Sequence, residues 1–471
     1  MAESDLQTRR PPKVKLSKSQ FHSNVHTFPE LRFEDQRLSS FSGAVVLQAL
    51  FQKLKLSHRL QECFEHRGEK LVVGFRAVAL ILIMHLMLGY RRLRDIEYYQ
   101  DDPVVLRALS LKRMPHVSTI SRTLSRMDRG SVENVRLVMR ELVLERLMTE
   151  RLPRVTLDFD GSVISTGRYA EGTAIGYNTH KKGERSYYPL FCTVAQTAQV
   201  LDVFHRRGNV HDSHQSISFM AHCIAQVRAR LPGVVVETRK DSAFFNDETV
   251  DFLNTEGVEF TISVPFERFA DLKALIERRH HWKPLDAEWD YFEDKWAPDC
   301  WDKRYRFLFL RHRVKKQRKE PVQLELFVPR EEGYEFKVVV TNKRCTAKTI
   351  LLFHNGRGSQ ENIFSELKSQ CNMDYVPTRR LVGNELYYLS AVLAHNLYRE
   401  LQMICDPATR TTTAKRAALW VFEEATSIRR KFIQRAGQLT RPHGRLRLRL
   451  SGNDATRKGL MHYLDSLARA S

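Results

Sequence analysis

Two strand-like runs that end in aspartate restrict the fold of this chain most strongly. In residues 155–160 apolar and polar side chains alternate, and Asp158 and Asp160 fall on the polar face. Residues 234–236 are three consecutive valines, typical of a buried strand, and Asp241 follows that run. Open α/β sheets bind ligands at the carboxyl ends of their strands, so we expect Asp160 and Asp241 at one such edge. Taken singly, an aspartate at either position is more often a helix cap or a turn residue.

A third acidic position lies on a segment with helical spacing, residues 354–368. At about 100° per residue, Arg357, Glu361 and Lys368 share one face, with His354 at its edge. A carboxylate flanked by two cations suits a site that holds both a divalent metal and a phosphate. The alternative is a solvated helix face with an ordinary Arg–Glu pair one turn apart.

Asp160, Asp241 and Glu361 together are a stronger signal than any one of them alone. Their hard carboxylate oxygens suit two Mg²⁺ ions, with Mn²⁺ as a substitute. Two such ions about 3.5–4 Å apart activate a nucleophile and stabilise a leaving oxygen in phosphoryl transfer. The three acids therefore indicate a metal-dependent site for chemistry on phosphate esters.

Around the glutamate the chain resembles the DDE transposases of bacterial insertion sequences, in particular the IS4-type superfamily and, within it, the IS1380 family. The superfamily signature spaces a tyrosine, an arginine, the catalytic glutamate and a lysine. Arg357, Glu361 and Lys368 match it in type and spacing, whereas His354 stands at the tyrosine position. The resemblance implies DNA contacts from Arg357 and Lys368. The tyrosine is associated with phosphate contact, and His354 can replace it only by donating a ring N–H.

Shorter motifs around the aspartates resemble the same superfamily. Asp160-Gly-Ser is similar to the motif of its first catalytic aspartate and Asp241-Ser-Ala-Phe to that of the second, and neither motif selects Asp158. The likeness covers roughly residues 70–450. It implies a transposase that binds double-stranded DNA, cuts at the terminal inverted repeats of its element and transfers the strands into target DNA. It also implies a homodimer that bridges two ends.

The order of the expected elements agrees with an RNase H-like core. Strand-like runs at 155–160, 187–194 and 199–205 are followed by alternating helices and strands up to residue 264. The expected fold class is α/β, with a β-rich insertion inside the RNase H-like core and a helical region before it. We expect six regions: a basic flexible tail, a helical, DNA-binding N-terminal region, the first segment of the core, the β-rich insertion, the second segment of the core with Glu361, and a basic C-terminal region (1–20, 21–150, 151–265, 266–340, 341–405 and 406–471).

A helix that begins near Ser118 has Arg122 and Arg126 on its outer face. It fits the recognition helix of a helix-turn-helix motif that reads the element ends. The alternative, which the sequence favours slightly, is a bundle helix with solvated basic positions. Near the C-terminus, arginines alternate with leucines over 445–450, which fits either contact with the DNA backbone or an edge strand guarded by charge.

The expected insertion holds four of the five tryptophans. In the IS4-type superfamily an aromatic ring in this insertion receives a base that is flipped from a DNA hairpin, and stacking recovers part of the unstacking cost. The sequence does not select one tryptophan, and most of them are expected to form the core of a small subdomain. The basic run at 315–319 is expected to be a solvated loop that contacts phosphate if DNA passes there.

The net charge of +21 implies a polyanionic partner, and nucleic acid fits best. No apolar span of membrane length is present, and the scattered cysteines indicate reduced thiols, so we expect a cytoplasmic protein without membrane contact. Three alternatives to an active transposase remain: a catalytically inactive DNA-binding descendant, a host nuclease of the same fold, and, more remotely, a basic protein that binds membranes.

Overall fold

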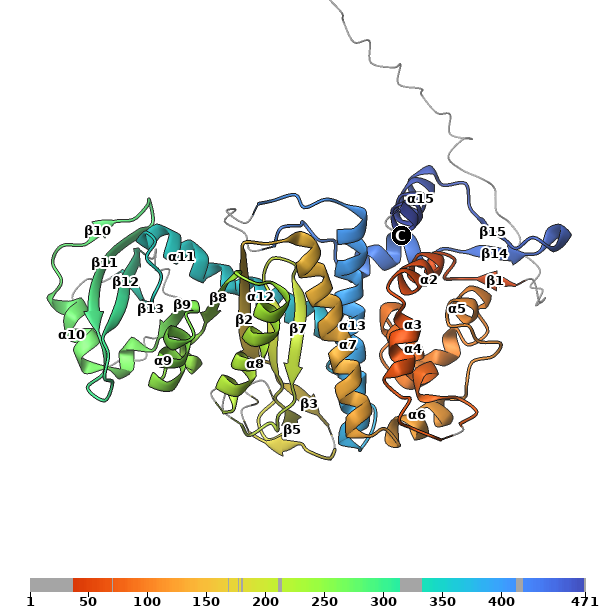
Figure 1. The fold of residues 1–471 in the computed structure, drawn as a ribbon, viewed down its shortest axis with the longest axis horizontal. Helices are drawn as coiled ribbons and strands as arrows, with labels where there is room; N and C mark the ends of the chain where they lie inside the picture. Colours follow the sequence, from red (N-terminus) through yellow and green to blue (C-terminus); the bar gives the residue numbers. More distant parts are fainter. Residues whose placement is uncertain are drawn as a thin grey trace, which may run out of the picture.

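The computed structural model describes residues 37–69, 71–167, 169–176, 178, 181–210, 214–313, 333–411 and 418–469. The expected tail at 1–20 and the basic run at 315–319 lie outside these residues. Figure 1 shows an elongated molecule, in which a central sheet separates a β-rich lobe from a group of short helices. The site-bearing elements belong to the central sheet and the helices that cover it.

Five strands of the central sheet have the order of an RNase H-like core, which confirms the expected fold class. The sheet order is β7-β6-β2-β8-β9; β2 is antiparallel to β6, β6 is antiparallel to β7, and β2, β8 and β9 run parallel. Helix α8 leads from β7 to β8 and α9 leads from β8 to β9, and both bury their apolar faces against the sheet. The elements are β2 (Arg154–Gly161), β6 (Leu190–Val194), β7 (Gln199–Phe204), α8 (Ser216–Arg230), β8 (Val235–Lys240), α9 (Asp247–Thr255) and β9 (Glu259–Val264).

The segment expected as a β-rich insertion extends the same sheet. Its last strand pairs antiparallel with β9, and the three others follow outward, so the whole sheet has nine strands in the described residues. Aromatic side chains fill this lobe; Phe292 stacks on Phe309 with ring centroids 4.4 Å apart. Its elements are η3 (Phe266–Arg268), α10 (Ala270–Arg278), β10 (Lys283–Pro284), β11 (Trp289–Trp296), β12 (Tyr305–Arg313) and β13 (Tyr334–Thr341).

Two long helices, α7 (Arg129–Glu150) and α13 (Leu381–Cys405), lie against β7 and separate the sheet from the N-terminal helices. Nearly every residue of α13 is buried, since it packs on both sides. In the described parts of the chain, no helix is both long and apolar enough to cross a bilayer. The N-terminal elements are β1 (Leu38–Ser39), α2 (Ala44–Lys53), α3 (Leu56–Glu62), α4 (Phe75–Met87), η1 (Leu93–Tyr98), α5 (Pro103–Ala108) and α6 (Val117–Ser125).

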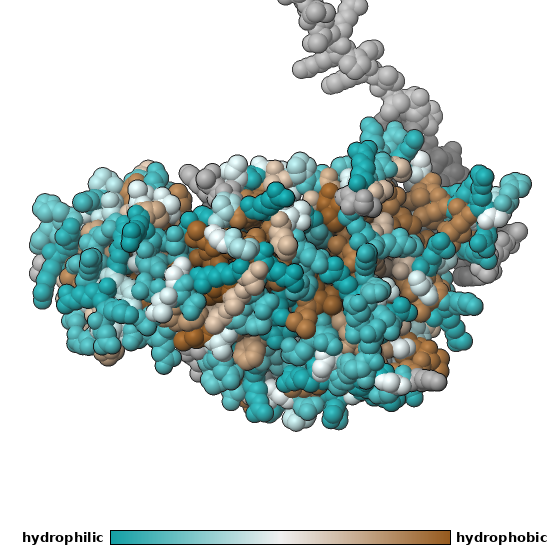
Figure 2. Space-filling model, viewed as in Figure 1, coloured by the Kyte–Doolittle hydropathy of each residue, from teal (hydrophilic) through white to brown (hydrophobic). Residues whose placement is uncertain are grey.

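The C-terminal segment returns to the N-terminal helices rather than forming a separate body. Helix α15 packs on α2, and β14 pairs with β1 at the start of the described chain. On the face shown in Figure 2, hydrophilic side chains cover most of the surface, and hydrophobic areas reach it near the centre and over the N-terminal helices. The segment contains α14 (Ala425–Ile428), η5 (Arg429–Ile433), β14 (Gly437–Thr440), η6 (Pro442–Gly444), β15 (Arg447–Leu450) and α15 (Asp454–Arg469).

The remaining elements surround the candidate site. A small sheet, β3-β5-β4, follows β2 directly. On the polar face of the main sheet a helix is interrupted by a short turn and then continues. These elements are β3 (Ile164–Thr166), β4 (Ala174–Ile175), β5 (Arg185–Tyr187), η2 (Ser242–Phe244), α11 (Ala347–Asn355), η4 (Gly356–Gly358) and α12 (Ser359–Ser369).

Candidate active site

The two aspartates on β2 have different environments. Asp158 is buried and forms an ion pair with Arg239 of β8, whose Nε lies 2.9 Å from its Oδ1. Asp160, two residues nearer the end of the strand, is partly exposed, with 18% of its side chain accessible. The Asp158 carboxylate is already engaged by an arginine that would be left as an unpaired buried charge without it, whereas Asp160 is accessible to a ligand. This arrangement supports the preference for Asp160.

Asp241 follows β8, which runs parallel to β2, so both strands end at the same edge of the sheet. Its Oδ1 accepts a hydrogen bond from the backbone N–H of Ala243, 3.1 Å away, and caps η2. The preceding side chain, Lys240, is buried with Nζ 4.2 Å from the ring centroid of Phe159. Burial lowers the pKa of Lys240 to about 7, against the opposing effect of the nearby aspartates. The edge thus combines two carboxylates with a buried amine behind them.

Arg357 connects Asp160 to the third acid. Its Nη1 lies 3.5 Å from Oδ2 of Asp160, and its Nη2 lies 3.7 Å from Oε1 of Glu361. Glu361 is in the first turn of α12, and 68% of its side chain is exposed. The structure therefore brings Asp160 together with Arg357 and Glu361, although Asp160 precedes these two residues by about two hundred positions in the chain.

The continuous helix expected over 354–368 is wrong in one respect, because η4 separates α11 from α12. Gly356 and Gly358 explain the break, since glycine disfavours a helix interior. Gly356 also has a steric role: a Cβ atom there would clash with Nη1 of Arg239. That arginine donates a hydrogen bond to the carbonyl of Phe353, 3.3 Å away, and so holds the turn on β8.

His354 does not face the site. It is buried, with Nδ1 3.0 Å from Oγ1 of Thr261 and Nε2 2.9 Å from Oγ of Ser263. Burial, together with the positive charges of nearby basic side chains, lowers its pKa well below the ordinary value. The expected phosphate contact is therefore corrected: both ring nitrogens are engaged inside the protein, where the ring ties α11 to β9.

Lys368 lies in the last turn of α12 and is partly buried. Burial lowers its pKa, and the charges of Asp374 and Asp160 oppose that shift. Its amine is thus electrostatically coupled to the acid at the end of β2. Gln360 fixes the start of the same helix, because its Nε2 donates to the backbone carbonyl of Asp158 at 3.0 Å.

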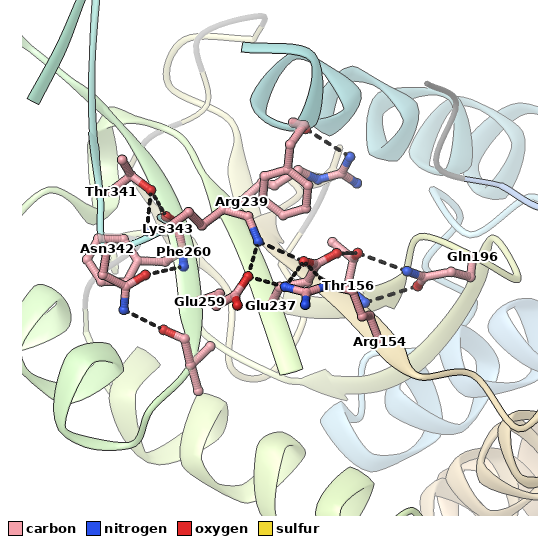
Figure 3. Close-up of polar contacts among 12 residues, drawn as sticks. Arg154, Thr156, Gln196, Glu237, Arg239, Glu259, Phe260, Thr341, Asn342 and Lys343 are labelled. Atoms are coloured by element: carbon pink, nitrogen blue, oxygen red, sulfur yellow. Dashed lines mark hydrogen bonds and ion pairs between the residues drawn. The ribbon is translucent and has the colours of Figure 1, made fainter. Parts of the chain in front are cut away.

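A buried polar layer behind the site was not found from the sequence (Figure 3). Nζ of Lys343 lies 2.8 Å from Oε2 of Glu237, and Thr156 donates to the other oxygen of that carboxylate at 2.7 Å. Burial raises the pKa of Glu237, but the ion pair with Lys343 outweighs it, so the pKa lies below the ordinary value. Arg154 and Glu259 complete the cluster. The sequence signal for this layer is the polar residue at every second position of β2, β8 and β9, because such residues share one face of the sheet.

The two arginines expected on the recognition helix differ in their contacts. Arg126 pairs with Glu69, with Nη2 2.6 Å from Oε2. Arg122 is exposed, and its guanidinium donates to Ser118 and Thr119 of its own helix, 3.3–3.4 Å away. Figure 1 places α6 among the N-terminal helices, away from α12, so the structure does not bring these arginines to the acids.

The four tryptophans of the lobe all pack on other side chains. Trp301 packs on Phe245, which follows Asp241 by four residues, with the two ring centroids 5.0 Å apart. A hollow of about 520 Å³ lies beside it, with Phe269 in its lining. The other three contact aromatic rings of the lobe or the imidazole of His312 (Trp282, Trp289 and Trp296).

The three acids suit a divalent cation in chemistry, although their side chains do not converge on a single point. Within the described residues, no three histidine, cysteine, aspartate or glutamate side chains lie close enough together to hold a metal ion as they stand. Asp160 and Glu361 approach the same guanidinium of Arg357, however, and the exposed Glu361 can turn toward Asp160 by side-chain rotation. The donor set consists of carboxylate oxygens, which are the ligands that hard divalent cations prefer.

The strand order and the carboxylates at the sheet edge place the chain in the RNase H-like class. The chain matches the family described as "Transposase DDE domain group 1" over residues 22–471 and belongs to that family. A transposase function follows from this membership. The comparison with curated proteins found no match.

Two solved structures show distant similarity to the chain. The piggyBac transposase synaptic complex with hairpin DNA is 12% identical with a TM-score of 0.39, over 76% of this chain and 74% of that one. The Mos1 mariner paired end complex with Mn is 13% identical with a TM-score of 0.18, over 46% and 76%. Both TM-scores are low, so the fold assignment rests on the sheet topology.

Proposed function

We propose that this chain cuts DNA at the terminal inverted repeats of an insertion sequence and transfers the strands into target DNA. Asp160, Asp241 and Glu361 are the catalytic residues and hold two Mg²⁺ ions, with Mn²⁺ as a substitute. The observation that carries the proposal is the shared contact of Arg357 with Asp160 and Glu361, because it brings the acid of α12 to the end of β2. We also propose that the chain is a member of the IS4-type superfamily and, within it, of the IS1380 family.

Mg²⁺ at the acids would neutralise charge that develops on the phosphate during strand cleavage. The protein's own groups position the substrate. The guanidinium of Arg357 can bind phosphate with two parallel hydrogen bonds once the carboxylates have another partner. Lys368 adds a second positive charge on the same helix. His354 has no part in phosphate binding and instead fixes the position of α11.

Recognition of the element ends is assigned to the N-terminal helices. Arg122 is the better candidate for DNA contact on α6, since Arg126 is engaged by Glu69. A homodimer would bring two ends together. If excision proceeds through a hairpin, Trp301 is the candidate for stacking on a flipped base, because it packs beside the segment that follows Asp241.

Two features favour a second candidate, a DNA-binding descendant without catalysis. Arg357 neutralises two acids in the structure, and His354 departs from the signature tyrosine. Against it, the chain retains all three acids, Asp160, Asp241 and Glu361. A host nuclease is a third candidate, and its cleavage would not depend on the repeat sequence.

The test uses supercoiled plasmid with or without the inverted repeats that flank the gene, in Mg²⁺ or in EDTA. We expect metal-dependent cuts at the repeat boundaries, and no cuts by the Asp241→Asn variant. Specific binding without any cut in Mg²⁺ or Mn²⁺ would favour the inactive descendant. Cuts in both plasmids at equal rates would favour the nuclease.

A further inference from the structure

We propose that the hairpin β14–β15 is a DNA-binding arm whose arginine face lies along the phosphate backbone, outside the catalytic site. The proposal rests on the proposed function in one respect, because that function identifies the polyanion as double-stranded DNA. Everything else follows from the register, charge and attachment of the hairpin.

The register gives the hairpin one cationic and one apolar face. Arg447 lies opposite Thr440 and Arg449 lies opposite Gln438, and directly opposed residues share a face. Leu448 belongs to the other face and packs against the main hydrophobic core. Leu448 therefore packs toward the body of the protein, whereas Arg447 and Arg449 are exposed on the opposite face of the hairpin.

No acidic side chain within the hairpin compensates its positive charge, although Glu97, Asp101 and Asp102 line a hollow together with Arg449. Residues 437–450 include four arginines and no acidic residue, and all four are exposed. No ion pair within the described residues involves any of the four. Because these arginines have no ion pair to break, the free-energy cost of moving them into contact with phosphate is small. Each contact also releases counterions from DNA. The four are Arg441, Arg445, Arg447 and Arg449.

The arm projects from the molecule but is firmly attached at its base. Figure 1 shows it extending from the end that carries the N-terminal helices. The backbone N–H of Ser42 donates to the carbonyl of Arg435 at 2.9 Å, and β1 adds a third strand. A Cβ on Gly437 would lie 2.7 Å from the carbonyl oxygen of Arg449 and would also clash with Ser42, so the packing there is tight. A rigid arm loses little conformational entropy on binding.

The turn at the tip is also built for a fixed shape. His443 has φ 48° and Gly444 has φ +77°, both in the left-handed region. The ring of Pro442, which precedes them, fixes the φ angle of that residue. The turn thus sets the register that places Arg447 and Arg449 on one face of the hairpin. A two-stranded ribbon of this kind is narrow enough to enter the major groove of B-DNA.

A second copy of the chain is a poorer partner for the same surface. β15 is the outer strand of its sheet, so its edge could pair with another β15. Such pairing would place Arg447 and Arg449 beside the same residues of the other copy. Like charges on neighbouring strands are destabilising, and the excess charge keeps the edge from self-association.

The experiment measures the affinity of the full chain for a labelled terminal-repeat duplex in EDTA, over a series of salt concentrations. For Arg447→Gln/Arg449→Gln we expect about tenfold weaker binding near physiological salt, and a slope of log K against log salt that is smaller by about two. Arg447→Lys/Arg449→Lys should retain most of the affinity, since it keeps the charge. Arg268→Gln/Arg278→Gln removes the same charge from exposed positions of the β-rich lobe and is the matched control.

Unchanged affinity and slope in the glutamine variant, with an unchanged thermal melting temperature, would overturn the proposal. So would a loss of dimer or of binding to phosphatidylserine vesicles without any loss of DNA affinity, since the hairpin would then serve another partner. An equal loss in the matched control would also overturn it, because the effect would reflect net charge alone. DNA cleavage plays no part in this assay, so its outcome is independent of the catalytic assignment.

Discussion

Arg357 lies between two acids that come from distant parts of the chain: its guanidinium is 3.5 Å from Oδ2 of Asp160 and 3.7 Å from Oε1 of Glu361. The arginine thus supplies positive charge between these carboxylates. The same contact predicts a competition, because a divalent cation and the guanidinium need the same oxygens.

Arg357→Gln should separate cation binding from cleavage. Removing the competing guanidinium should tighten Mn²⁺ binding by roughly 2–10-fold, whereas cleavage should slow by about 100-fold because a phosphate contact is lost. Calorimetric titration with Mn²⁺ and a cleavage assay on the same preparation measure both effects. Arg357→Lys keeps the charge, so its Mn²⁺ affinity and its cleavage rate should lie between those of the unaltered chain and of the glutamine variant. Weaker Mn²⁺ binding by the glutamine variant would contradict this account.

Gly356→Ala should destabilise the fold by roughly 2–4 kcal/mol, because the new methyl group would displace Arg239 from Asp158. Urea unfolding measures the change. Gly358 is the matched control in the same turn: its φ is −56°, and an added Cβ meets nothing within 4 Å. Gly358→Ala should leave stability unchanged or raise it by about 0.5–1 kcal/mol. Equal effects of the two substitutions would refute the role given to Gly356.

His354→Phe should lower stability by about 1–3 kcal/mol, because Thr261 and Ser263 lose their hydrogen-bond partner in the interior. Affinity for duplex DNA, measured in EDTA, should stay within about twofold of that of the unaltered chain. A large loss of DNA affinity with unchanged stability would restore the phosphate contact that the sequence resemblance implies.

His205 makes stability depend on pH. Burial lowers its pKa to about 3, whereas an unfolded histidine titrates near 6.5. Between these values the unfolded chain binds one more proton, so stability falls as pH falls, by about 1.4 kcal/mol per pH unit for this residue. The measurement is the free energy of urea unfolding at pH 7.5, 6 and 5. In His205→Phe the part of its pH dependence that comes from this histidine should vanish. Tyr388→Phe keeps the neighbouring ring and should retain the slope. An unchanged slope in His205→Phe would contradict the assignment.

The central sheet was predictable because its strands have clear local patterns. The alternation at 155–160 and the valines at 234–236 correspond to β2 and β8, and the aspartates end at one sheet edge as expected. The order of the five strands followed from the same runs. Short-range periodicity and chain order are enough for these strands.

Other features depend on contacts between distant residues, which periodicity does not reveal. The burial of His354 requires β9 beside α11, and the break at Gly356 requires Arg239 from β8. The pairing of β14 with β1 joins residues about four hundred positions apart. In each case the partner is set by tertiary packing, so local propensity could not show it.

The catalytic assignment is tested most directly with Glu361→Gln. This substitution keeps the size of the side chain and removes its charge, and the exposed position leaves the fold intact. The measurement is the rate of Mg²⁺-dependent cutting of a labelled terminal-repeat duplex, with DNA affinity determined in EDTA on the same preparation. We expect cutting to fall by at least about 1000-fold and affinity to change by less than about threefold. Cutting by Glu361→Gln at the rate of the unaltered chain would contradict the assignment.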